Sequence, residues 1–230
     1  MDFGDTTVII PTLNEEKNIG EMLRILDKLY PGINIIVSDD GSKDKTQDIV
    51  RNYGNPNFIV LDRSKQKVKG LTIRVIDAAK TVKTEFIVVT DADMQHPPEK
   101  IKEIIEKLRN GYNIVIGCRE KILAKWPWHR KLMSKTAIIL GQLRLLLKGI
   151  YVKDVVSGFF GVRSDLFKEV ISKAEHKFEP RGYKVLFDLL KQINRSKKIG
   201  YVNYQFGLRK RGESKISRRH VVLYFKSLFK

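Results

Sequence analysis

Short apolar runs alternate with longer amphipathic stretches through the first half of the chain. Five runs rich in Val, Ile and Phe have the length of buried strands, at residues 7–10, 34–38, 58–61, 85–90 and 113–117. Between them, apolar residues recur at helical spacing, as at Ile19, Met22, Leu23 and Leu26. This β-α-β-α order predicts an α/β fold, with a mostly parallel sheet that carries helices on both faces.

After Arg119 the pattern becomes mainly helical. The elements expected there are a loop over 121–130, one or two surface helices over 132–147, helices over 165–174 and 183–193, and a strand over 199–204.

A last helix is expected from Ser217 onward. It would carry Val221, Tyr224, Phe225 and Leu228 on one side, and Arg219, Lys226 and Lys230 on the other. Basic amphipathic helices of this kind lie in membrane interfaces, but a terminal helix packed on its own domain has the same pattern. The pattern leaves both interpretations open.

Two carboxylates and an amide follow the apolar run at 85–90. Asp91 and Asp93 stand two residues apart where a buried strand ends, and Gln95 follows. Ligands bind at such strand ends in open α/β sheets. Oxygen-only ligands suit a hard Mg²⁺ or Mn²⁺ ion, although an acidic turn that caps the following helix would look similar. We expect His96 to lie beside such an ion and not on it.

Other polar segments also follow strands. Residues 11–15 come directly after the first expected strand and residues 39–42 after the second. Because the carboxyl ends of parallel strands share one edge of a sheet, these segments should meet the loop at 91–95.

The composition narrows the class of protein. A chain of 230 residues with 42% hydrophobic and 30% charged residues can bury a full core. The lone Cys118 excludes a disulfide framework. We expect no signal peptide at residues 1–5, and no run approaches the about 18 uncharged apolar residues that a membrane span needs.

The net charge of +18 is unevenly placed. Residues 1–118 hold 17 Lys and Arg against 18 Asp and Glu, whereas residues 119–230 hold 27 against 8. The second half is therefore expected to attract polyanions, such as nucleic acid, an anionic membrane or phosphate substrates.

The strand-end segments at residues 11–15, 39–42 and 91–95, in this order, resemble those of the inverting glycosyltransferases of GT-A fold. Within that family the chain is most similar to the dolichyl-phosphate (polyprenyl-phosphate) mannosyltransferases. The narrower resemblance rests on Asp91-Ala92-Asp93-Met94-Gln95-His96-Pro97-Pro98-Glu99, on residues 126–135 and on Arg211-Gly212-Glu213-Ser214-Lys215. It covers nearly the whole chain. It implies one catalytic domain over 1–230, with a nucleotide-sugar and metal half (1–118) and a basic acceptor half (119–230) that carries membrane-interface helices.

The resemblance also assigns roles to residues. The implied nucleotide-sugar pocket consists of Pro11, Leu13, Glu15, Ser38, Asp39, Asp40, Asp91, Ala92, Asp93, Arg209 and Lys215. The implied metal ligands, for Mg²⁺ or Mn²⁺, are Asp91, Asp93 and Gln95. The implied catalytic residues are Asp93, with Arg119, Arg130 and Ser134 for the acceptor phosphate. Asp154 and the turn Ser157-Gly158-Phe159 would close the sugar pocket.

The implied reaction is transfer of mannose from GDP-mannose to a lipid phosphate. It would take place at the cytoplasmic side of the cell membrane, with the chain either peripheral or the catalytic part of a membrane protein. UDP-glucose is the alternative donor. A metal-dependent nucleotidyltransferase and a nucleic-acid-binding protein are the rival classes, and we expect no nucleic-acid partner.

Three positions depart from the family pattern. Leu13 stands where an aromatic residue is usual, Arg74 where the Gly-Leu-x-x-Ala signature has a small residue, and Ala78 where Gly is frequent. These departures bear on the identity of the donor and on the packing of the helix that contains Arg74 and Ala78, and not on the fold.

Overall fold

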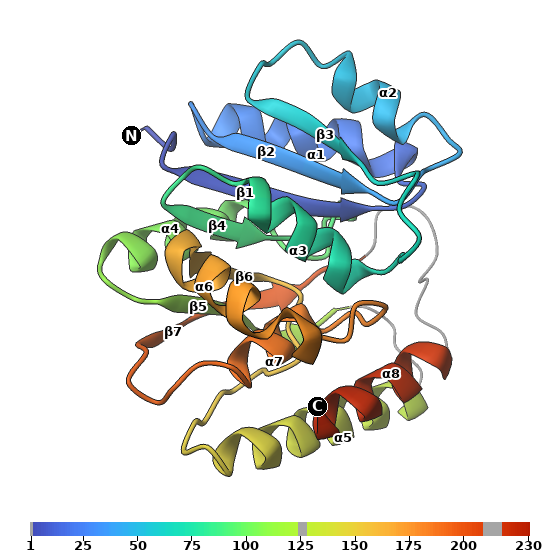
Figure 1. Ribbon diagram of the computed structural model, residues 1–230. Helices are drawn as coiled ribbons and strands as arrows, with labels where there is room; N and C mark the ends of the chain where they lie inside the picture. The colour runs from blue at the N-terminus through green and yellow to red at the C-terminus, as the bar shows by residue number, and fades with distance from the viewer. Residues whose placement is uncertain (1, 124–127, 209–217) are drawn as a thin grey trace.

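The computed structural model describes residues 2–123, 128–208 and 218–230. In these residues a seven-stranded sheet has the order β3-β2-β1-β4-β6-β5-β7 (Figure 1). The strands are β1 (Thr6–Thr12), β2 (Asn34–Asp39), β3 (Phe58–Asp62), β4 (Phe86–Val89), β5 (Ile114–Ile122), β6 (Phe160–Arg163) and β7 (Ile199–Phe206).

The sheet is mostly parallel, which confirms the predicted fold class. β1 pairs in parallel with β2 and β4, β2 with β3, and β5 with β7. Only β6, within the described chain, runs antiparallel, to both β4 and β5. Both halves of the chain therefore contribute strands to one sheet.

Strand β6 was not predicted from the sequence. It is four residues long and contains Gly161, which is a poor strand former. The structure explains the glycine, because an added Cβ would lie 2.4 Å from Ile104 Cγ2 and 2.8 Å from Leu108 Cδ1. The helix that contains Ile104 and Leu108 packs directly on the strand backbone at this glycine. The sequence of the strand alone does not predict that contact.

Helices cover both faces of the sheet (Figure 1). On one face lie α1 (Glu16–Leu29), α2 (Thr46–Arg51) and α4 (Ile101–Arg109), the last preceded by the 3₁₀ turn η1 (Pro98–Lys100). On the other lie α3 (Leu71–Thr81), α6 (Ser164–Ala174) and α7 (Val185–Leu190), with the turn η2 (Glu175–Lys177) after α6. Each face has its own buried apolar cluster, so the sheet is sandwiched between two cores.

Two long helices lie side by side beyond α7 (Figure 1). They are α5 (Trp128–Leu146) and α8 (Arg218–Phe229). The expected loop over 121–130 is therefore wrong at both ends, because β5 continues to Ile122 and α5 begins at Trp128. Residues 124–127 lie outside the described chain.

Polar contacts attach α8 to its own protein. Tyr224 donates a hydrogen bond of 2.6 Å to the carbonyl of Ala137, and Arg144 Nε donates one of 2.9 Å to the carbonyl of Leu228. Beneath α8, Lys191 pairs with Asp188 at 2.9 Å, and both side chains are almost fully buried. One side of the helix thus packs on its own domain, as one of the two interpretations expected.

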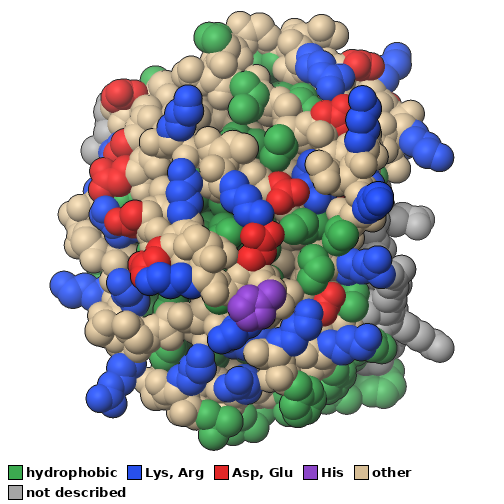
Figure 2. Space-filling model, in the orientation of Figure 1, with side chains coloured by type: hydrophobic (Ala, Val, Ile, Leu, Met, Phe, Trp, Pro, Cys, Tyr) green, Lys and Arg blue, Asp and Glu red, His purple; other side chains and the backbone are tan. Residues whose placement is uncertain are grey.

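Large apolar side chains on this helix pair, and in the turn that follows α5, are exposed to solvent. Trp128 is 76% exposed, Leu147 82% and Phe229 88%. Figure 2 shows apolar side chains gathered at the lower rim of the molecule, over α5 and α8, with Lys and Arg side chains above them. No helix in the described part of the chain is long and apolar enough to cross a membrane.

Candidate active site

A cavity of about 500 Å³ opens at the carboxyl ends of β1 and β4. One wall comes from the β1 end, through Pro11, Leu13 and Glu15. A second comes from residues 91–96, which follow β4 and are called the acidic loop below. The remaining walls come from the start of α3, from Arg119 on β5 and from α5, α7 and α8. The predicted meeting of the strand-end segments at one edge of the sheet is confirmed, because Thr12 pairs in register with Asp39 and the backbone N–H of Asn14 donates to Ser42 Oγ at 2.7 Å. The first and third segments line the cavity, whereas the second does not.

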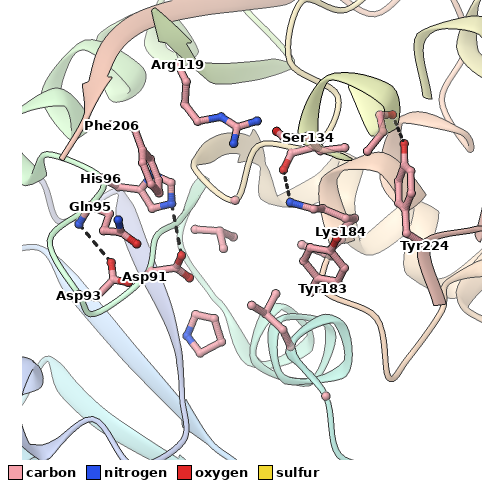
Figure 3. Close-up of a pocket in the computed structure, with 18 of the residues that line it drawn as sticks. Asp91, Asp93, Gln95, His96, Arg119, Ser134, Tyr183, Lys184, Phe206 and Tyr224 are labelled. Carbon is pink, nitrogen blue, oxygen red and sulfur yellow. Dashed lines mark hydrogen bonds and ion pairs between the residues drawn. The ribbon is translucent and has the colours of Figure 1, made fainter. Parts of the chain in front are cut away.

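The acidic loop places its polar side chains on the cavity wall. Met94 adopts a left-handed φ of 62°, which turns the backbone between Asp93 and Gln95. The backbone N–H of Gln95 donates to Asp93 Oδ1 at 3.1 Å, and Gln95 Nε2 donates to the carbonyl of Gly207 at 3.1 Å. Asp91, Asp93 and Gln95 all line the cavity, as the sequence predicted for one site (Figure 3).

His96, the last residue of the acidic loop, lines the cavity and contacts Asp91. Its Nε2 lies 3.3 Å from Asp91 Oδ2, its Nδ1 lies 2.9 Å from the Tyr204 hydroxyl, and its ring stacks on Phe159. Burial raises the pKa of Tyr204 well above its ordinary value, so the hydroxyl stays protonated. The imidazole is thereby held in one orientation next to Asp91.

The donor set of the acidic loop fits a hard divalent cation. Two carboxylates and one amide oxygen are the ligand types that Mg²⁺ and Mn²⁺ take. Among the described residues, no group of three His, Cys, Asp or Glu side chains forms a complete metal cage. An ion held here would therefore complete its coordination with water and substrate phosphates, as Mg²⁺ commonly does.

Hydrogen bonds from neighbouring residues hold the Asp39 side chain in place at the end of β2. It accepts hydrogen bonds from Thr12 Oγ1 at 2.7 Å, from Ser42 N at 2.7 Å and from Gln47 Nε2 at 2.8 Å. Burial would raise the pKa of Asp39, but the bonds from Ser42, Gln47 and Thr12 outweigh burial and lower it. Neither Asp39 nor Ser38 lies on the cavity wall.

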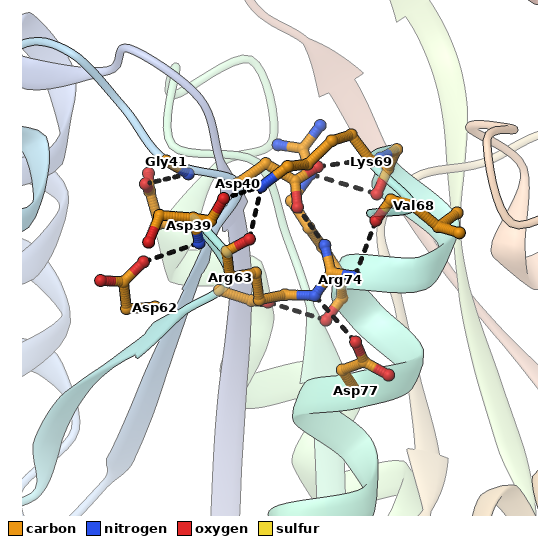
Figure 4. Close-up of polar contacts among 12 residues, drawn as sticks. Asp39, Asp40, Gly41, Asp62, Arg63, Val68, Lys69, Arg74 and Asp77 are labelled. Atoms are coloured by element: carbon orange, nitrogen blue, oxygen red, sulfur yellow. Dashed lines mark hydrogen bonds and ion pairs between the residues drawn. The ribbon is translucent and has the colours of Figure 1, made fainter. Parts of the chain in front are cut away.

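Asp40 lies in a buried ion-pair network behind the cavity (Figure 4). It pairs with Arg63 Nη1, with Arg74 Nε at 3.0 Å and with the backbone N–H of Gly70 at 2.8 Å. Arg63 Nε also pairs with Asp77 at 2.8 Å. Asp40 itself does not line the cavity, whereas its partner Arg74 does.

Arg119 reaches the cavity from β5 and is held by Asp154. Its Nε and Nη2 donate to the two carboxylate oxygens of Asp154 at 2.8 and 2.9 Å. Burial lowers the pKa of Arg119, but the bonds and charge of Asp154 outweigh it, and the pKa lies above its ordinary value. The guanidinium is therefore a fixed cation on the wall (Figure 3).

The other predicted acceptor residues are only partly described. Ser134 on α5 lines the cavity. Arg130 lies in the first turn of α5, and its side chain is outside the described part of the structure, as are Arg209 and Lys215. Ala92 lines the cavity with the rest of the acidic loop.

Several residues that line the cavity were not predicted as site residues, and two of them are polar neighbours in the chain. Tyr183 and Lys184 precede α7 and line the side opposite the acidic loop (Figure 3). Lys184 Nζ donates to the carbonyl of Val156 at 2.6 Å and lies 4.4 Å from the centre of the Tyr183 ring. A lysine at a helix start carries no signal of its own in one sequence, so only the tertiary fold reveals this placement.

The cavity changes character from one end to the other. Near the acidic loop it is polar, with Glu15, Asp91 and Asp93. Toward α5 and α8 the wall becomes apolar, through Leu132, Met133, Ala137, Val221, Tyr224 and Phe225. The cations Arg119 and Lys184 stand between these ends. The arrangement suits two phosphate-bearing ligands that meet at the middle, one of which continues along an apolar wall.

Comparison with known proteins identifies relatives over nearly the whole chain. Residues 7–171 match the model of glycosyl transferase family 2. A dolichol-phosphate mannosyltransferase of Pyrococcus furiosus is 38% identical over 229 residues, which are 97% of this chain and 62% of that protein. A dolichol-phosphate mannosyltransferase of Saccharomyces cerevisiae is 26% identical over 239 residues, covering 96% of this chain and 85% of the relative.

A solved structure shares the fold. The glucosyl-3-phosphoglycerate synthase of Mycobacterium tuberculosis, in complex with Mn²⁺, UDP and glucosyl-3-phosphoglycerate, is 21% identical. It matches with a TM-score of 0.65 over 97% of this chain and 80% of that one. The similarity confirms the predicted sheet and helix arrangement.

Proposed function

The chain belongs to glycosyl transferase family 2, as its motifs predicted, and we propose that it transfers mannose from GDP-mannose to a dolichyl or polyprenyl phosphate. The observation that carries the proposal is the single cavity that joins the acidic loop, fixed cations and an apolar wall. The names of the P. furiosus and S. cerevisiae relatives support the same acceptor class.

The donor is proposed to occupy the polar end. Pro11, Leu13 and Glu15 would contact the nucleoside, together with Ala92 and, from outside the described residues, Arg209 and Lys215. Asp91, Asp93 and Gln95 would hold Mg²⁺ or Mn²⁺, which would supply positive charge where negative charge grows on the departing nucleoside diphosphate. His96 would keep Asp91 turned toward the cavity.

The acceptor is proposed to enter from the α5 and α8 side. Arg119, Ser134 and Lys184 would bind its phosphate, and we propose the same role for Arg130, whose side chain is outside the described part of the structure. An arginine fork matches a phosphate bidentately, and Asp154 holds the fork of Arg119 in place. The apolar residues of α5 and α8 would contact the first units of the lipid chain.

The chemistry then needs positioning more than proton transfer. A phosphate oxygen of the acceptor is already anionic, so it can attack the sugar C1 without a strong base. The new C1–O bond forms as the C1–O bond to the nucleoside diphosphate breaks, the leaving group takes the electron pair, and the configuration at C1 inverts. Arg119 and Lys184 would reduce the repulsion between the two anionic substrates.

We propose that the exposed side of α5 and α8 rests on the cytoplasmic leaflet of the cell membrane. Trp128 on α5, Leu147 directly after α5 and Phe229 on α8 are all exposed, and the second half of the chain holds 27 Lys and Arg against 8 Asp and Glu. Apolar side chains that insert among lipids and basic residues that meet an anionic leaflet both favour such binding.

One experiment tests the reaction. The protein would be incubated with polyprenyl phosphate, Mn²⁺ or Mg²⁺, and either GDP-mannose or UDP-glucose labelled separately in the base and in the sugar. We expect sugar label, and no base label, in the organic phase with GDP-mannose. Asp93→Asn should remove the product, whereas Asp165→Asn, at an exposed position on α6, should not.

Each other result has a clear meaning. Base label in the lipid would indicate a nucleotidyltransferase, and product from UDP-glucose alone would change the donor. No product from any nucleotide sugar, with a correctly folded protein, would refute the proposed activity.

A further inference from the structure

Arg74 occupies the cavity wall at a position where the family signature has a small residue. It lies in the first turn of α3, and its side chain is 13% exposed. Its Nε is engaged with Asp40 at 3.0 Å and with the carbonyl of Gly70 at 3.2 Å. Among the described residues, no acceptor bonds its Nη1 or Nη2.

The network behind Arg74 carries no net charge. Arg63 and Arg74 face Asp40 and Asp77, and the side chains of Arg63 and Asp40 are only 3% and 2% exposed. Asp40 therefore compensates the charge of Arg74 and fixes the direction of its guanidinium. A phosphate binds most strongly to a cation whose charge is not compensated. A neutral ligand instead gains binding free energy from correctly placed N–H donors.

The position of Arg74 also favours a neutral ligand. Helix α3 packs on β1 and β2, and Arg74 lines the same cavity as Pro11 and Leu13 at the β1 end. The acidic loop, where a diphosphate would lie beside a cation, follows β4. The charge of Asp91 in that loop also acts on Arg74, so we infer that its guanidinium borders both the part of the cavity proposed for the nucleoside and the acidic loop next to it.

We propose that Arg74 selects the base of the donor nucleotide and that it selects guanine. The two terminal nitrogens of a guanidinium form a planar pair of donors that matches the adjacent O6 and N7 acceptors of guanine. Adenine offers one acceptor and one donor on that edge, and uracil offers no such acceptor pair. The inference rests on the proposed function only in placing a nucleotide in this cavity.

Equilibrium binding of free nucleotides tests this role without transfer. Titration calorimetry would compare GDP, UDP and 7-deaza-GDP, in which a C–H replaces the N7 acceptor, on the wild-type chain, Arg74→Ala and Arg74→Lys. The wild type should bind GDP about 10-fold more tightly than 7-deaza-GDP, the value of one charged hydrogen bond, and about 100-fold more tightly than UDP.

Arg74→Ala should bind GDP and 7-deaza-GDP equally, with the affinity for UDP within about 3-fold of the wild type. Arg74→Lys keeps the ion pair with Asp40 but loses the fork, so its base preference should also disappear. Asp40 retains Arg63 and the Gly70 N–H in both variants, so the fold is expected to survive.

Three results would overturn the inference. The first is equal binding of GDP and 7-deaza-GDP by the wild type. The second is an equal loss of GDP and UDP affinity in Arg74→Ala, which would indicate that Arg74 contacts a phosphate. The third is an unchanged GDP affinity in Arg74→Ala. A negative transfer assay with the predicted ratios intact would instead remove the proposed reaction and leave the base recognition standing. Transfer from UDP-glucose together with tight binding of UDP would instead remove the proposed selection of guanine and leave a glycosyl transfer reaction standing.

Discussion

The pair of Arg119 and Asp154 allows a quantitative prediction for Asp154→Asn. The two side chains are 10% and 7% exposed and form two hydrogen bonds of 2.8 and 2.9 Å. Asparagine has nearly the same shape as aspartate, so the substitution leaves packing intact. It removes the negative charge and leaves the Arg119 guanidinium as a largely buried cation, with the Phe206 ring 6.0 Å away.

The expected cost follows from that burial. Breaking a buried pair by removing one partner costs about 3–5 kcal/mol, and the lower end applies because Arg119 borders an open cavity. For a chain of 230 residues, about 3 kcal/mol corresponds to a fall in Tm of roughly 6–12 °C. The double variant Arg119→Gln with Asp154→Asn removes both charges, so it should be at least about 1 kcal/mol more stable than the two single effects summed.

Thermal unfolding followed by circular dichroism measures these shifts. Glu85→Gln is the matched control, because its pair with Arg163 has a similar length of 3.0 Å but is 52% and 30% exposed. That variant should lose no more than about 0.5 kcal/mol. If Asp154→Asn melts within about 2 °C of Glu85→Gln, the claim that Asp154 compensates a buried cation in the site is wrong.

Three other predictions concern the outer face, the Asp39 turn and the sheet core. Leu147→Glu should weaken binding to anionic vesicles, measured by co-sedimentation, by about 10-fold or more. Its Tm should not change, because Leu147 is 82% exposed. The control Ile59→Glu, at a position on β3 that is 49% exposed, should leave vesicle binding unchanged. Folding lowers the pKa of Asp39 below 3.8, so its charge stabilises the fold above that pH and the contribution is lost as the pH falls through the lowered value. The difference in unfolding free energy between wild type and Asp39→Asn should accordingly be largest near neutral pH and shrink below pH 3.8, as denaturant titrations at several pH values would show; a constant difference would contradict this. Gly161→Ala should cost about 1–3 kcal/mol by the same method, since its Cβ would lie 2.4 Å from Ile104 Cγ2, while Gly20→Ala in α1, 3.3 Å from Ile49 Cγ2, should be close to neutral.

The sequence predicted the parts of this protein that local patterns encode. Apolar runs identified β1, β2, β4 and the first half of β5, because a strand that is buried on both faces must be apolar along its length. The shorter apolar run of β3 and the alternating pattern of β7 were also recognised, although these two strands are only partly buried. The acidic loop could be placed at the site because it follows such a run. The short strand β6 was missed because its glycine is explained only by the packing of α4.

Side-chain partners between distant segments could not be predicted. Asp40 and Arg74 are 34 positions apart, and Arg119 and Asp154 are 35 apart, so no periodicity relates them. The sequence could flag Arg74 as a departure from a signature but not show that Asp40 holds it on the cavity wall. Lys184 joined the site only because α7 begins beside Val156.

The central claim is that one cavity receives the lipid from the α5 and α8 side and the nucleotide sugar from the β1 and β4 side. A polyprenyl phosphate analogue with a photoreactive group on its first isoprene unit tests it most directly, with peptide mapping after irradiation. The account predicts crosslinks to Leu132, Met133, Val221 or Phe225, which excess polyprenyl phosphate abolishes. Crosslinks confined to the separate hollow between α6 and residues 192–197, or undiminished by competitor, would contradict it.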